Sequence, residues 1–175
     1  MHLLLSIIMI VIVWKAGNWR NWQKYHTVML YFALGNLLYN FLTANHFLWR
    51  LDADFISTHT LTEMLYTFIV FPATALLFIG NYPEDKGIGR VFLHYVWYIG
   101  WYAGIEWIFV KTGHIEYQYG WSYSWSVFFD CFMFPMLRLF YKKPLIAYMV
   151  TLLIVVFFIW WFEIPVHIPV EERGK

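Results

Sequence analysis

The sequence predicts an all-α fold, a polytopic membrane helix bundle with six transmembrane helices of which the first is short. Three observations support this prediction. Of the 175 residues, 61% are hydrophobic and only 13% are charged, whereas soluble domains carry about 25% charged residues. The apolar residues gather into runs close to the length of about 20 residues that a membrane-spanning helix needs. Turn-forming residues separate these runs, as in "NYPEDKG".

The predicted spans follow one another closely, so we expect one integral membrane domain over residues 1–175, with a loose C-terminal tail at 163–175. The spans are Leu3–Trp14, Tyr25–Leu42, His59–Ile79, Arg90–Val110, Trp121–Leu139 and Leu145–Phe162. The first has about twelve mostly apolar residues. No Lys or Arg precedes it and no A-x-A motif follows, so we predict a short retained helix and not a signal peptide.

Prolines and glycines occur within four of these spans. Pro72 and Pro135 interrupt the third and fifth spans, and each frees a carbonyl one turn earlier, so we expect a kink at each. We expect the small residues Gly35, Gly100, Ala103 and Gly104 to lie where two helices approach closely.

Positive charge sets the predicted orientation. Eight of the 12 Lys and Arg residues lie at the loops that follow the first, third and fifth spans, and four lie on the other side. Because cytoplasmic loops carry an excess of Lys and Arg, we place loops 15–24, 81–89 and 140–144 in the cytoplasm and both termini outside.

Charge and cysteine content exclude several classes of protein. The net charge is only +1, which gives no electrostatic basis for binding nucleic acid. Cys131 is the single cysteine, so an intrachain disulfide and a multi-cysteine metal site are excluded.

Spans two to five each carry a stripe of polar residues four positions apart, a spacing that places them on nearly the same helix face. The stripes are Asn36 and Asn40; His59, Glu63 and Thr67; His94, Tyr98, Tyr102 and Glu106; and Ser122, Ser126 and Asp130. An ionised carboxylate that faces lipid at mid-membrane costs at least about 2.5 kcal/mol. We therefore expect Glu63, Glu106 and Asp130 to converge on one sheltered chamber in the outer half of the membrane.

This chamber is the predicted ligand-binding site. Its expected ligand-binding residues are Asn36, Asn40, His59, Glu63, Tyr98, Tyr102, Glu106 and Asp130. The three acids are also the candidate catalytic residues. The alternative interpretation is structural, because hydrogen bonds between membrane helices are common and contribute about 0.6–2 kcal/mol each.

We predict no metal site. The residues available for one at the outer surface are His46, His59, Glu63 and His114. Their spacing is generic, and neither an H-E-x-x-H motif nor a Cys–His set is present. The sequence identifies no cofactor.

Four segments resemble a family of small multi-pass membrane proteins of endospore-forming Bacillota that has no assigned function. They are "GNWRNWQKYHTVMLYFALGNLLYNFLT", "HTLTEMLYTFIVFPATALLF", "GIEWIFVKTGHIEYQYGW" and "FDCFMFPMLRLFYKKP". The resemblance implies a helical fold and a location in the bacterial plasma membrane. It implies no activity, so no catalytic residue is transferred.

Three functions fit these features, and the lipid bilayer is the expected partner in each. The first is a protein that binds, senses or moves a small amphiphilic ligand, for which a tetrapyrrole is one candidate. The second is a membrane enzyme that acts on an isoprenoid or lipid by acid catalysis, although the P-x-E-E/D signature of small membrane cyclases is absent. The third is a proton or ion pathway. We favour the first.

Overall fold

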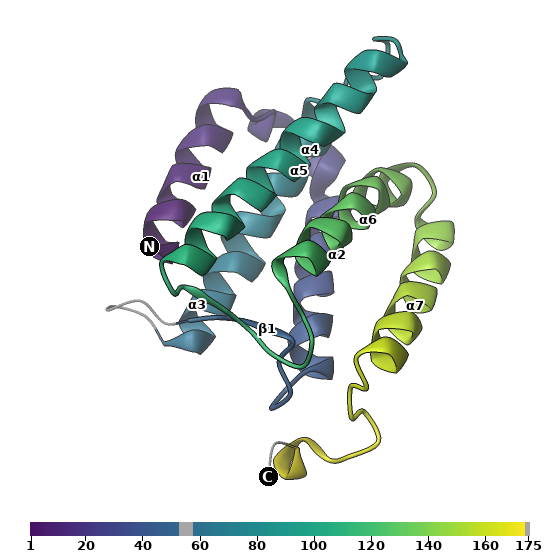
Figure 1. The fold of residues 1–175 in the computed structure, drawn as a ribbon. Coiled ribbons are helices and arrows are strands. Elements are labelled where there is room, and N and C mark those ends of the chain that lie inside the picture. The colour runs from purple at the N-terminus through teal and green to yellow at the C-terminus, as the bar shows by residue number, and fades with distance from the viewer. Residues whose placement is uncertain (53–57, 174–175) are drawn as a thin grey trace.

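The computed structural model describes residues 1–52 and 58–173, and it is mostly helical (Figure 1). Its helices agree in position with the six predicted apolar runs, which confirms the all-α class. The helices are α1 (His2–Ala16), α2 (Trp22–Leu42), α3 (His59–Leu65), α4 (Phe71–Gly80), α5 (Ile88–Lys111), α6 (Tyr123–Lys142) and α7 (Pro144–Trp161), with short segments η1 (Trp19–Asn21), η2 (Tyr66–Val70) and η3 (Val170–Glu172). The α3, η2 and α4 segments form one continuous run.

The core lies where α2, α4 and α6 meet. Val28 of α2, Phe78 of α4 and Phe134 of α6 have no exposed surface. In α4 every side chain from Ala73 to Ile79 is buried, because this helix has neighbours on all sides. In contrast, α7 packs on the outside of the bundle against α6, and most of its side chains are exposed (Figure 1).

A π-helical segment stands where the sequence predicts a proline kink. Pro72 has no N–H to donate, and the preceding η2 turn widens so that the Phe71 N–H bonds the carbonyl of Tyr66, five residues earlier. The second proline, Pro135, lies inside α6, which stays helical through it. The wider turn matters for the site because Tyr66, Val70 and Phe71 line the cavity described below.

The glycine expectation is wrong at all three positions. A Cβ atom at Gly35, Gly100 or Gly104 would meet no other atom within 4 Å. These glycines lie on exposed helix faces, so they do not mark close approaches between helices within the chain.

A short antiparallel ribbon joins two of the loops between predicted spans. Strands β1 (Trp49–Leu51) and β2 (Ile115–Tyr117) pair with Arg50 opposite Glu116. The Tyr39 hydroxyl holds this ribbon to α2, because it donates to the Trp49 carbonyl and accepts from the Trp49 N–H at 2.8 Å. With only three residues in each strand, the ribbon leaves no alternating pattern to detect.

The connecting loops lie at two opposite ends of the bundle (Figure 1). At one end, Asn81 bonds the Ala16 carbonyl at 3.3 Å, and Glu84 pairs with Lys142 at 3.1 Å. The ribbon and both termini lie toward the other end (Figure 1). There Arg173 donates to the Leu42 carbonyl at 3.0 Å, so the tail that the sequence predicts to be loose contacts the end of α2.

By length and composition, two helical runs of the described residues are able to cross a membrane, His59–Gly80 and α7. The α1 and α2 pair meets the same criteria jointly, with an 88° bend at the break between them. The α5 and α6 helices do not meet these criteria. The bundle is therefore helical with apolar helices, and the finer prediction of six spans is not established by the fold.

Candidate functional site

Glu63 belongs to a compact hydrogen-bonded cluster between α2 and α3. Its Oε2 atom accepts from the Nδ2 atoms of Asn36, at 3.1 Å, and Asn40, at 2.9 Å. Asn36, which is buried, also donates to the Thr67 hydroxyl at 2.9 Å. The polar stripes of the second and third predicted spans therefore do face one another, and they satisfy one another.

A separate cavity of about 140 Å³ lies between the α3–α4 run, α5 and α6, beside α1 and the ribbon. Its wall is almost wholly apolar and strongly aromatic, with a few polar groups. The lining residues are Leu5, Met9, Trp49, Leu51, Tyr66, Val70, Phe71, Thr74, Tyr102, Ile105, Glu106, Phe109, Ile115, Trp121, Ser126, Phe129, Asp130 and Met133. An apolar cavity with a few convergent polar groups is the usual form of a small-molecule site.

Two of the three predicted acids share this cavity, and Glu63 is not among its lining residues. The expectation of a single three-acid chamber is therefore wrong. The acids are separated because their helices have different neighbours. Glu63 faces the side-chain amides of Asn36 and Asn40 on α2, whereas Glu106 and Asp130 come from the adjacent helices α5 and α6.

Asp130 is the least satisfied polar residue of the cavity wall. It is 5% exposed, and its Oδ2 atom has no hydrogen-bond partner among the described residues. Glu106 differs, because its Oε1 atom accepts from the Tyr117 hydroxyl at 2.6 Å. The Ser126 hydroxyl accepts from Trp121 Nε1 at 2.8 Å and lines the same cavity.

The predicted tyrosines have different surroundings. Tyr102 lines the cavity, and its hydroxyl donates to Thr74 at 2.8 Å. Tyr98 lies one turn away and packs its ring against Phe78 and Phe134 in the core. Tyr98 is therefore not part of the cavity wall, because a spacing of four residues on a helix also moves a side chain along its axis.

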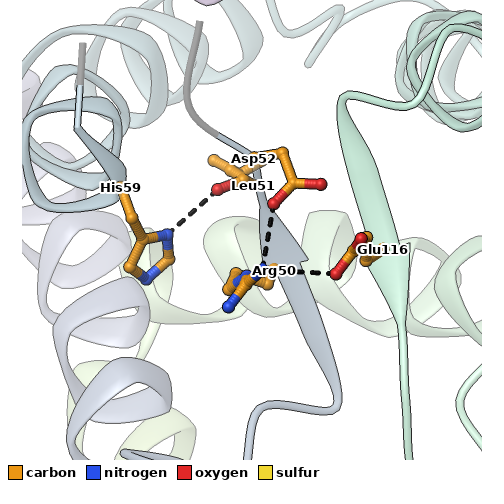
Figure 2. Close-up of polar contacts among 5 residues, drawn as sticks. All are labelled: Arg50, Leu51, Asp52, His59 and Glu116. Carbon is orange, nitrogen blue, oxygen red and sulfur yellow. Dashed lines mark hydrogen bonds and ion pairs between the residues drawn. The ribbon is translucent and has the colours of Figure 1, made fainter.

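The predicted histidines do not form a common site. His59 contacts the Leu51 carbonyl through Nδ1 at 3.0 Å (Figure 2), and His114 contacts the Thr112 hydroxyl at 2.9 Å. His46 stacks on Tyr119, with 3.5 Å between the ring centroids. Within the described ranges, no group of three His, Cys, Asp or Glu residues is arranged to hold a metal ion.

The loops at the ribbon end carry a group of charged and polar side chains. Arg50 of the ribbon bonds both Asp52, at 3.2 Å, and Glu116, at 3.3 Å (Figure 2). Burial lowers the pKa of His46, and the positive charge of Arg173 lowers it further. Burial also raises the pKa of the Tyr117 hydroxyl, and its bond to Glu106 raises it again.

The sequence-based list of site residues omits four that lie in or beside the cavity wall: Thr74, Tyr117, Trp121 and Ser126. Ser126 could be found from its stripe with Asp130. Thr74 follows Pro72 in a run with no polar period, and Tyr117 lies in the undetected ribbon, so neither leaves a signal in the sequence.

In comparisons with known proteins, no protein-family model matches the chain, and no curated protein or solved structure matches it.

Proposed function

We propose that this chain is a multi-pass protein of the bacterial plasma membrane whose intramembrane cavity binds a small amphiphilic molecule. The observation that carries the proposal is the position of Asp130. This carboxyl is 5% exposed and has one oxygen without a partner in the described part of the chain, at the wall of an otherwise apolar cavity. A buried polar group is normally hydrogen-bonded, so a ligand that donates to Asp130 would complete the site.

The exposed surface supports the membrane location. Large apolar side chains stand outward on α2, on the α3–α4 run, on α5 and on α7. Examples with more than half of their surface exposed are Leu30, Leu34, Phe41, Phe68, Phe92, Leu93, Trp97, Met149, Leu152, Leu153 and Val156. Contiguous apolar patches of this extent are rare on soluble monomers, and acyl chains would cover them.

The distribution of charge supports the multi-pass arrangement. The predicted cytoplasmic loops meet at one end of the bundle, as the contacts of Asn81 with Ala16 and of Glu84 with Lys142 require. The ribbon and the termini occupy the opposite end (Figure 1). Both ends carry charged side chains, and the helix surfaces between them are apolar, as a bilayer of about 30 Å hydrocarbon thickness demands.

The cavity limits the size of the ligand. A cavity of about 150 Å³ holds one benzene ring, and this one measures about 140 Å³. The enclosed part of the ligand is therefore one ring or a short alkyl chain. A tetrapyrrole or a complete isoprenoid chain is too large to be enclosed, which favours a small amphiphile and disfavours the prenyl-acting enzyme.

A matched pair of tryptophan substitutions tests the proposal. Met133→Trp narrows the cavity, whereas Met149→Trp makes the same change on the exposed face of α7, where Met149 is 67% exposed. Each protein is recovered from carbonate-washed membranes in mild detergent, and its co-purifying small molecules are quantified by mass spectrometry. We expect one small molecule with the wild type and with Met149→Trp, and about tenfold less of it with Met133→Trp, because filling a cavity excludes its occupant.

Two results would contradict the proposal. Release of the protein by the carbonate wash would show that it is not membrane-embedded. An identical small-molecule content in all three proteins would show that the cavity is not the binding site.

A further inference from the structure

We propose that the cavity selects an organic monocation, an ammonium group carried on an apolar body about the size of one aromatic ring. This inference rests on the proposed function and specifies the chemistry of its ligand. It follows from three properties of the cavity wall: a buried acceptor without a donor, two acids with no basic residue among the described lining residues, and many aromatic side chains.

The acceptor excess centres on Asp130. Five aromatic residues with a donor group lie on or beside the cavity wall, Trp49, Tyr66, Tyr102, Tyr117 and Trp121. Tyr102 donates to Thr74 at 2.8 Å, Trp121 to Ser126 at 2.8 Å and Tyr117 to Glu106 at 2.6 Å, and the Tyr66 hydroxyl contacts His2 Nδ1 at 2.9 Å. Oδ2 of Asp130 thus receives no hydrogen bond from the described residues. A ligand that binds there must bring its own donor, and an ammonium group brings up to three.

The charge balance favours a cation over a neutral donor. Glu106 and Asp130 both line the cavity, and the described lining residues include no Lys, Arg or His. Arg138, on the same helix as Asp130, pairs instead with Glu84 at 2.6 Å. A buried acid without a counter-ion opposes its own ionisation, and a bound ammonium group supplies the missing counter-ion.

The aromatic wall favours the same ligand. Ring faces attract a cation within about 6 Å of the ring centroid. Seven aromatic side chains line the cavity, namely Trp49, Tyr66, Phe71, Tyr102, Phe109, Trp121 and Phe129. A neutral alcohol would satisfy Oδ2 of Asp130 equally well, but it would gain little from the rings or from the second acid.

Three probes of one shape and different charge test the inference on the unchanged protein. Benzylammonium, benzyl alcohol and benzoate are titrated into the detergent-purified wild type, and binding is followed by the fluorescence of the cavity tryptophans, Trp49 and Trp121, and by equilibrium dialysis. We expect benzylammonium to bind about tenfold or more tightly than benzyl alcohol, with benzoate weakest. This comparison needs no variant to fold.

Two substitutions then locate the charge preference. Asp130→Asn keeps the shape of the side chain and removes its acid, so the preference for benzylammonium over benzyl alcohol should fall several-fold, and only the part due to Glu106 and the rings should remain. Asp85→Asn removes an acid from an exposed loop and should leave the preference unchanged.

Each outcome decides one of the two proposals. Equal binding of benzylammonium and benzyl alcohol to the wild type, or an undiminished preference in Asp130→Asn, would overturn the monocation at Asp130 and leave a small-molecule binding cavity standing. If none of the three probes binds and no small molecule co-purifies, the proposed function itself fails.

Discussion

Glu63 and Asp130 are acids in apolar helical runs, and their surroundings are opposite. Glu63 receives two amide hydrogen bonds from α2, whereas Asp130 has an oxygen that receives none from the described residues. The difference lies in the facing helix. The α2 helix offers the donors Asn36 and Asn40 one turn apart, and the wall around Asp130 offers donors that are already engaged.

The comparison distinguishes a carboxyl group with a structural role from one that is available to a ligand, although both are acids. A polar group whose hydrogen-bond partner lies on another helix of the same chain helps to hold the two helices together. A polar group that faces a cavity and has no hydrogen-bond partner in the chain gains one only when a ligand binds. The same carboxylate chemistry therefore predicts opposite effects of substitution at the two positions, and three experiments would break or sharpen the comparison.

The largest expected effect is at Glu63. Glu63→Ala removes the acceptor of two amides, and we expect the free energy of unfolding to fall by about 1–3 kcal/mol, because a buried donor left without a partner carries its full desolvation cost. The measurement is unfolding in mixed detergent micelles, followed by tryptophan fluorescence. Glu116→Ala is the control, because Glu116 forms only an exposed ion pair with Arg50 and should change stability by less than about 0.5 kcal/mol. If the two variants are equally stable, the Glu63 cluster is not structural.

Asp130→Leu should have the opposite sign. Replacing an unpartnered buried carboxyl with an apolar side chain is neutral or stabilising, and we expect a gain of about 1 kcal/mol in the same unfolding assay. The ligand described above should no longer bind to this variant. A loss of stability as large as that of Glu63→Ala would mean that Asp130 has a structural partner, and the contrast between the two acids would disappear.

The helices could be predicted from the sequence because their signals are local. Apolar runs and turn residues located α2 at 25–42, and the structure begins it three residues earlier, at Trp22. Polar residues four apart correctly indicated that Asn36 and Asn40 share a face, as did Ser126 and Asp130.

The grouping of the acids could not be predicted, because it depends on which helices are neighbours. The α4 helix packs against α2, and α5 packs most closely against α6, so Glu63 and Glu106 belong to different sites although both lie in the predicted outer half. The ribbon was missed for a related reason. Its three-residue strands are stabilised by pairing across 66 positions between Arg50 and Glu116 and not by their own pattern.

The smallest effect is expected at Glu84, an acid in an exposed loop. Here the chain itself supplies the cations, Arg138 at 2.6 Å and Lys142 at 3.1 Å. The hydrogen bond from Arg138, and then that from Lys142, lower the pKa of Glu84 below its ordinary value of 4.5. Because the pKa is lowered in the folded state, this contribution to stability is complete above pH 4.5 and disappears as the pH falls through the lowered value.

We therefore expect Glu84→Gln to lower the melting temperature by less than about 2 °C at neutral pH, since the pair is exposed and solvent screens it. The difference between the variant and the wild type should vanish in acid, once Glu84 is protonated in the wild type. Melting curves of both proteins in mild detergent at pH values on either side of 4.5 measure this, with Asp85→Asn as the control for removing a neighbouring loop charge. A difference in melting temperature that persists in acid would show that Glu84 contributes through contacts other than its charge. The pairing of Glu84 with Arg138 and Lys142 would then not distinguish it from an acid that has no basic partner, such as Asp130.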